Sequence, residues 1–227
     1  TDRSVQRDDA AGLIAAGNTA VANPAQVWGS PEVSDEIKLW GNFGIPLANS
    51  KELYAHANYV SKTVRGGFYF RNPNTRGSVF SGDGGATLLI GDLLDAADGV
   101  LDGSAGCPTV TVTNNIPDPA ALATVFSDPN CFSFQEIFPG GFTPSFGGDL
   151  TDYSIAAGIK GETSGGWYWD ASLSYGSNEV DFFIDNTVNA SLGPVTPTSF
   201  DPGAYTQEEF DINLDASYAI GDSANLG

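Results

Sequence analysis

Five stretches of this sequence alternate apolar with polar residues, and the segments that join them are alternately short and very long. The alternating stretches are 33–45, 51–60, 153–160, 167–175 and 210–220. Successive side chains of a β-strand point to opposite faces, so a period of two predicts strands that are apolar on one face. The pattern therefore predicts an all-β fold, with antiparallel strands in an up-and-down meander.

Connection length distinguishes the two ends of the predicted strands. The first, third and fifth connections are short, the fourth is long, and the second spans roughly eighty residues, which is rare inside a compact soluble domain. An up-and-down meander gathers its short connections at one end. Outer-membrane barrels place short turns at the periplasmic side and long loops outside. The sequence thus predicts a partial transmembrane β-barrel with long extracellular loops.

The predicted barrel segment covers residues 1–227. Its expected parts are an extracellular loop at 1–32, a hairpin at 33–71, a long extracellular loop at 72–151, a hairpin at 152–188, an extracellular loop at 189–206 and a strand at 207–220. A short helix is expected at 8–17, where two aspartates precede apolar residues and a glycine follows them.

A soluble β-sandwich is the structural alternative, because its strands alternate in the same way. Sandwiches, however, show turn signals about every 8–12 residues. The long second connection and the wide spacing between strand pairs favour the barrel.

The net charge of −19 makes nucleic acid a poor partner, since phosphates would be repelled. Basic residues are concentrated in the first third of the chain, and Lys160 is the only one after Arg76. The acidic loops indicate a solvated surface. The spacing of Asp92, Asp95, Asp98 and Asp102 does not match a calcium-binding loop, so no metal site is predicted.

The two cysteines, Cys107 and Cys131, lie in one stretch rich in proline, glycine and asparagine. Their number and setting predict a disulfide and an oxidising compartment, with two free thiols as the alternative. CxxC spacing is absent from the sequence, which argues against a zinc site or a redox motif.

Sequence motifs for catalysis are missing. The single histidine, His56, lies on the polar face of a predicted strand. No nucleophile elbow, HExxH pair or phosphate-binding glycine loop occurs. We therefore expect no enzymatic activity, no catalytic residue and no cofactor.

A cluster of basic and aromatic residues at the outer end of the second strand is the better candidate for ligand contact. The proposed ligand-binding residues are Arg65, Arg71, Arg76, Phe68 and Phe70. Guanidinium groups pair with phosphate and carboxylate, and aromatic rings can stack on a sugar or an aromatic ligand. The alternatives are solvated or ion-paired arginines and aromatic packing inside the loop.

Segments 31–39, 52–59, 66–77, 128–142 and 211–218 resemble the TonB-dependent outer-membrane receptors of Gram-negative bacteria. The most specific are Arg-Asn-Pro-Asn-Thr-Arg-Gly at 71–77 and Cys-Phe-Ser-Phe-Gln-Glu at 131–136. The resemblance implies a barrel of about 22 strands, closed by an N-terminal plug. It also implies uptake of a siderophore, vitamin or oligosaccharide. The implied partners are outer-membrane lipid, lipopolysaccharide, a small nutrient and the TonB complex, which would act through the plug. Neither a plug nor the remaining strands are expected in this sequence.

Two other functions are compatible with the sequence. One is a secreted all-β binding module that self-assembles as an adhesive through its open strand edges. The other, less favoured, is a β-rich hydrolase with two carboxylates about 5–9.5 Å apart. The sequence names no particular substrate.

Overall fold

The computed structural model describes residues 4–5, 7–27, 31–93, 106–220 and 224–227. The chain forms two compact units. The loop unit comprises Thr1–Pro31, Gly66–Phe146 and Phe183–Asp201. The sheet unit comprises Glu32–Arg65, Gly147–Phe182 and Pro202–Gly227.

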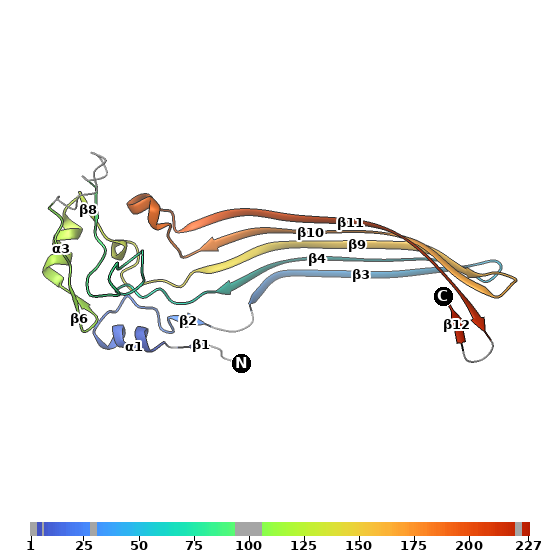
Figure 1. Cartoon of the computed structure of the whole chain (residues 1–227), viewed down its shortest axis with the longest axis horizontal. Coiled ribbons are helices and arrows are strands. Elements are labelled where there is room, and N and C mark those ends of the chain that lie inside the picture. The colour runs from blue at the N-terminus through green and yellow to red at the C-terminus, as the bar shows by residue number, and fades with distance from the viewer. Residues whose placement is uncertain (1–3, 6, 28–30, 94–105, 221–223) are drawn as a thin grey trace. The chain divides into compact units, whose positions relative to one another are not determined.

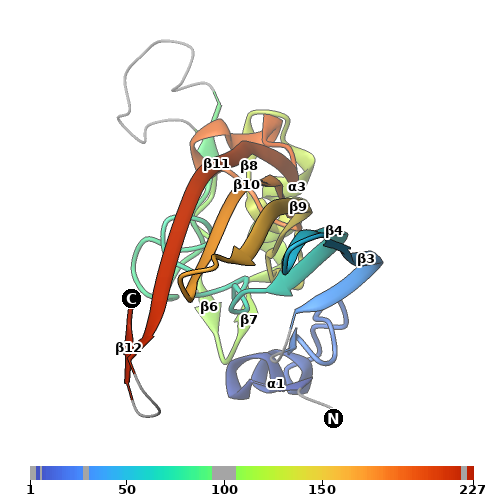
Figure 2. The same ribbon diagram turned by 90° about the vertical axis from the view of Figure 1, so that its right-hand side faces the viewer.

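A six-stranded sheet contains all the long strands (Figure 1). Its strands are β3 (Glu32–Leu47), β4 (Lys51–Gly67), β9 (Ser145–Glu162), β10 (Trp167–Asp185), β11 (Ser199–Ile220) and β12 (Ala224–Leu226). They are hydrogen-bonded in the order β12-β11-β10-β9-β4-β3, so each strand lies beside its neighbours along the chain (Figure 2). This order confirms the all-β antiparallel class and the meander. The sheet is open, with β3 and β12 at its edges.

A short turn connects the two strands within each of the first two hairpins, as expected. The β3–β4 turn follows the Leu47–Lys51 pair and places Asn49 and Ser50 at positive φ of 60° and 54°. The β9–β10 turn is closed by a 2.8 Å hydrogen bond from the Thr163 N–H to the Trp167 carbonyl. Gly166 adopts a φ of +82° there, which glycine reaches without steric cost.

Three predicted boundaries were wrong. Strand β9 begins at Ser145, inside the loop expected at 72–151, and β11 begins at Ser199, inside the loop expected at 189–206. Pro202 and Gly203 suggested a loop, yet β11 tolerates them because β12 pairs with it only from Tyr218 onward. The hairpin expected at 33–71 ends earlier, because β4 stops at Gly67.

The two faces of the sheet differ in polarity. Register pairs such as Leu39 with Tyr59 and Ile45 with Leu53 place apolar side chains on one face. Its large apolar residues, each at least 37% exposed, are Ile37, Leu39, Phe43, Ile45, Leu53, Tyr59, Tyr153, Ile155, Trp167, Leu173, Phe210, Ile212, Leu214, Tyr218 and Ile220. The other face is mainly polar, with the exposed Trp40 as an exception.

The loop unit contains short elements. They are β1 (Ser4–Val5), α1 (Asp8–Ala15), β2 (Gln26–Val27), β5 (Gly91–Asp92), β6 (Val112–Thr113), β7 (Ile116–Pro117), α3 (Pro119–Ser127), β8 (Cys131–Phe132), η1 (Phe134–Glu136) and η2 (Ala190–Val195). Helix α1 confirms the helix expected at 8–17. Helix α3 was not expected; the Asp118 carboxylate caps it by accepting from the Ala120 and Ala121 N–H groups. Among the described residues, no helix has the length and apolar character needed to cross a lipid bilayer.

Three hydrophobic clusters stabilise the loop unit. Cluster 1 contains Ala10, Leu13, Val21, Ala25 and Phe70; cluster 2 contains Phe80, Phe132, Phe134 and Phe142; cluster 3 contains Leu88, Val110, Val125 and Cys131. All buried hydrophobic side chains of the described residues belong to this unit. The segment expected to be a long loop is therefore a packed unit with its own cores.

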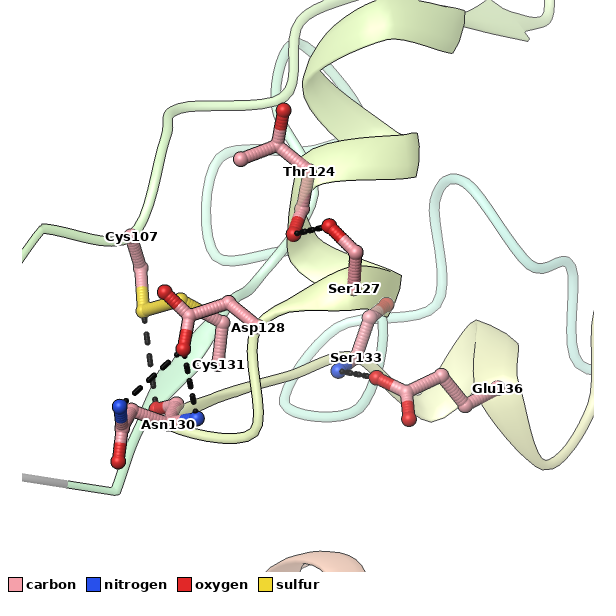
Figure 3. The surroundings of a disulfide bond; sticks show 8 residues. All are labelled: Cys107, Thr124, Ser127, Asp128, Asn130, Cys131, Ser133 and Glu136. Atoms are coloured by element: carbon pink, nitrogen blue, oxygen red, sulfur yellow. Dashed lines mark hydrogen bonds between the residues drawn. A yellow bond between two sulfur atoms is a disulfide. The ribbon is translucent and has the colours of Figure 1, made fainter.

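The expected disulfide is present between Cys107 and Cys131 (Figure 3). It joins the segment before β6 to the start of β8, which directly follows α3. The Asp128 carboxylate accepts hydrogen bonds from the Asn130 backbone and side chain at 2.9 and 3.2 Å, and so fixes the turn between α3 and Cys131.

Backbone hydrogen bonds join the two ends of the longest segment of the loop unit. The Phe68 N–H donates to the Pro144 carbonyl at 2.8 Å. Arg71 and Phe142 then exchange two backbone hydrogen bonds, of 2.7 and 3.1 Å. This short ladder continues antiparallel pairing within the loop unit.

Candidate functional site

The structure distributes the predicted ligand-binding residues among different environments. Arg65 is exposed on β4, where it pairs with Glu32 of β3 in the sheet register. Phe68 remains 40% exposed and contacts the Phe146 ring, with centroids 6.1 Å apart. Phe70 is only 7% exposed and packs in cluster 1. The alternative of aromatic packing thus describes Phe70, whereas Phe68 keeps an accessible ring.

Arg71 and Arg76 form a cationic pair in the loop unit. Partial burial lowers the pKa of Arg71, and the nearby charge of Arg76 lowers that pKa further. Among the described residues, no carboxylate lies within ion-pair distance of either guanidinium. Two adjacent cations without a carboxylate partner can contact an anionic group.

Buried amides fix the backbone of the arginine pair. The Asn72 carboxamide oxygen accepts from the Asn74 and Thr75 N–H groups at 2.8 and 3.3 Å. The Gln135 amide donates to the Pro73 carbonyl at 2.9 Å and to the Asn74 side-chain oxygen at 3.0 Å. Sequence reasoning missed this role of 72–74, although Asn-Pro-Asn between two arginines is a turn signal.

Acidic side chains in the described part of the loop unit serve the local fold. The Asp83 carboxylate accepts from the Ala86 and Thr87 N–H groups at 2.9 and 3.0 Å and from the Thr87 hydroxyl at 2.7 Å. These bonds hold the pKa of Asp83 well below its usual range. Among the described residues, no group of three metal-ligating side chains occurs. Asp95, Asp98 and Asp102 lie outside the described residues.

The apolar face of the sheet carries two aromatic pairs. Trp167 and Tyr218 stack with ring centroids 5.2 Å apart. Tyr153 and Tyr175 pack at 6.1 Å, eight residues further along β10 from Trp167. Between the two pairs lies an open apolar depression of about 330 Å³, whose lining includes Leu173 and Leu214.

The opposite face is cross-linked by hydrogen bonds between strands. The Tyr54 hydroxyl of β4 donates to the Asp170 carboxylate of β10 at 2.7 Å. Asp152 accepts from the Asn58 and Asn178 amides at 3.3 and 3.1 Å. The expected polar position of His56 is also found here, opposite Asn42 in the register. Hydrogen bonds between polar side chains therefore join strands β4, β9 and β10 across this face.

No protein-family model, curated protein or solved structure matches this chain.

Proposed function

We propose that this chain is part of the barrel of a TonB-dependent receptor in the outer membrane of a Gram-negative bacterium. The receptor takes up a scarce nutrient, such as a siderophore, vitamin or oligosaccharide, and is not an enzyme. Lipid and lipopolysaccharide cover the apolar face, and the TonB complex acts through a plug. One observation carries the proposal: an exposed apolar sheet face has an aromatic pair at each end of its apolar band.

The dimensions of the apolar face support a membrane band. The eight residue steps from Trp167 to Tyr175 extend about 27 Å at roughly 3.4 Å per step. A strand tilt of about 40° reduces this to about 20 Å, close to the ~25 Å apolar band of outer-membrane barrels. Tyrosine and tryptophan favour the two membrane–water interfaces, which accounts for an aromatic pair at each end.

Exposure supports lipid as the partner of this face. Phe210, Ile212 and Leu214 occupy successive outward positions on β11 and are 62%, 67% and 80% exposed. Removing each such side chain from water contributes about 1.5–3 kcal/mol. A contiguous face of this kind is unfavourable in water and favourable in hydrocarbon. The hydrogen-bonded polar face suits a wet lumen.

The receptor part of the proposal draws on the arginine pair and on the resemblance of residues 71–77 to this receptor class. Arg71 and Arg76 contact an anionic group of the nutrient or of lipopolysaccharide, and Phe68 provides a ring for stacking. Arg65, on β4 of the sheet unit, is a separate candidate contact for an anionic group. Phe70 supports the site from cluster 1 without touching the ligand.

A charge placed on either face of β11 tests the membrane assignment. Leu214→Arg puts a cation near the middle of the apolar face, whereas the matched control Asn213→Arg puts the same cation on the polar face. An arginine facing lipid at the bilayer midplane costs about 2–4 kcal/mol. We expect Leu214→Arg to lower the vesicle partition constant, measured by flotation across a lipid titration, by about 30-fold or more at 1.4 kcal/mol per tenfold. Equal effects of the two variants, or a wild-type chain that stays soluble without detergent, would refute the proposal.

A secreted, self-assembling module is the second candidate, favoured by the open edge of β3. All sixteen residues of this strand are exposed, so its free edge could pair with another chain. This function predicts assemblies that grow with protein concentration in detergent-free buffer, as measured by light scattering. A chain that enters vesicles and shows no such growth excludes it.

A further inference from the structure

A cavity of about 270 Å³ lies in the loop unit, between the end of α1, the β6–β7 hairpin and α3. Both ribbon views place the β6–β7 hairpin beside α1 (Figure 1, Figure 2). A Cβ on Gly12 of α1 would lie 3.0 Å from the Asn115 amide nitrogen, which confirms the contact. This volume is just below the ~300 Å³ at which pockets for drug-sized ligands begin, so it suits a single ring.

One wall of the cavity is apolar and accessible. Phe126 of α3 is 47% exposed and Ile116 of β7 is 49% exposed. Both side chains line the cavity, with Leu122 from the first turns of α3 beside them. An accessible aromatic ring next to aliphatic groups is a surface on which the C–H face of a ligand ring can stack.

Three amide side chains supply the polar groups of the cavity. Both N–H groups of Gln135 donate to protein oxygens, so its Oε1 is the acceptor left over. Gln135 is only 5% exposed, yet it lines the cavity. Asn18 joins two walls by donating to the Pro139 carbonyl at 3.0 Å. The side chain of Asn115 has no hydrogen-bond partner among the described residues.

Asn115 is held in place by its backbone. Its carbonyl accepts a 2.8 Å hydrogen bond from the Asn74 amide, and its φ is +67° in the β6–β7 turn. The neighbouring Asn114 has a similar φ of +53° but does not line the cavity. The two asparagines therefore differ in their access to the cavity while sharing one turn and one backbone conformation.

None of the ten lining residues is charged, although the chain carries 28 acidic and 9 basic residues. Amides offer donors and acceptors to a neutral partner, and the strongly negative chain disfavours an anion where no cation compensates it. We propose that this cavity binds a neutral, hydroxylated ring, that is, a saccharide unit. The ring stacks on Phe126, and its hydroxyls bond to Asn115 and Gln135.

This inference names the class of ligand. It rests on the proposed function only for the claim that the bound saccharide is then taken up. The cavity shares no lining residue with the arginine pair. Saccharide binding can therefore be measured without transport, and vesicle flotation separately tests the membrane assignment. Binding without insertion would remove the proposed function and leave the cavity assignment standing. Insertion into vesicles without saccharide binding would remove the cavity assignment and leave the proposed function standing.

Saturation-transfer NMR on the whole chain in detergent tests the proposal, with glucose, galactose and mannose as neutral probes and glucuronate as a charged ring of the same shape. One ring of this size binds with a dissociation constant of about 1 mM. We expect transfer to the C–H protons of at least one neutral sugar and a weaker signal from glucuronate. Asn115→Asp and Phe126→Ala weaken binding by about tenfold, as expected for a lost hydrogen bond or ring contact.

Matched variants separate binding from folding. Asn114→Asp adds the same charge to the same turn, and Leu89→Ala removes a 43% exposed side chain of the loop unit outside the cavity. Both controls should bind like the wild type. Three results would overturn the assignment: no transfer from any neutral sugar at about ten times the expected dissociation constant, equal losses in Asn114→Asp and Asn115→Asp, or tighter binding of glucuronate than of glucose.

Discussion

Removal of the disulfide should loosen the loop unit and leave the sheet unit unchanged. Cys107 and Cys131 are separated by 24 positions, so their bond closes a ring of about 25 residues. In the chain-entropy model such a ring stabilises the folded state by about 3.5 kcal/mol at 25 °C. The ring contains β6, β7 and α3, and Cys131 itself packs in cluster 3. The double variant Cys107→Ser/Cys131→Ser therefore combines the loss of this covalent ring with two polar groups in an apolar cluster.

Hydrogen exchange followed by mass spectrometry locates the loss. The Leu88 N–H donates to the Val110 carbonyl at 2.9 Å, and the Val112 N–H donates to the Ala86 carbonyl at 2.9 Å. Amides of these peptides should exchange up to about 400-fold faster in the double variant, since 1.36 kcal/mol corresponds to a factor of ten. Peptides from β4 and β10 in the sheet unit should be unaffected.

The control is the wild-type chain treated with reductant, which should reproduce the exchange pattern of the double variant without changing any side chain. Uniform acceleration in both units would contradict the division of the chain into separately stabilised parts. An increase below about threefold would show that the ring contributes less than about 0.7 kcal/mol, and the entropic reasoning would fail.

The remaining predictions concern the loop unit. Phe70→Ala should lower its free energy of unfolding by about 3–5 kcal/mol in denaturant titration, because Phe70 is buried in cluster 1; the exposed Phe68→Ala should cost much less. Asp83 has a lowered pKa when folded, so its stabilisation is present above the ordinary aspartate range and is lost as pH falls through and below that range. The exchange rate of the Ala86 and Thr87 amides, divided by the intrinsic rate at the same pH, should therefore rise in acid in the wild type, and an Asp83→Asn variant should lack this pH dependence.

The long strands could be predicted from the sequence because the alternation that marks them is a local signal. Alternation in 37–45 and 210–220 identifies the apolar face of the sheet residue by residue, and the structure keeps that assignment. The bulge between Ser34 and Ile37, with Asp35 at a φ of +52°, could not be predicted. The bulge shifts the pairing register through a local backbone conformation, which the alternation of apolar and polar residues does not reveal.

The candidate sites were predictable only where their residues are close in sequence. Arg71 and Arg76 are five positions apart, so their proximity could be inferred. The burial of Phe70 depends on α1, and the cavity unites Asn18 with Gln135; neither contact follows a period in the sequence. The sequence did not reveal the hydrophobic clusters of the expected loop, because irregular segments bury side chains without a repeating pattern.

The short ladder from Phe68 to Phe142 predicts an order of assembly. Pairing β4 with β9 joins residues that are separated by the whole segment between Gly67 and Ser145, which makes it the slowest contact of the meander to nucleate. Once the loop unit has folded, the Phe68–Pro144 hydrogen bond already holds the two strand ends together. The pairing of β4 with β9 can then extend residue by residue from these ends, as in the hairpins on either side. A loop unit that folds first would thus turn one high-contact-order step into a sequence of short-range ones.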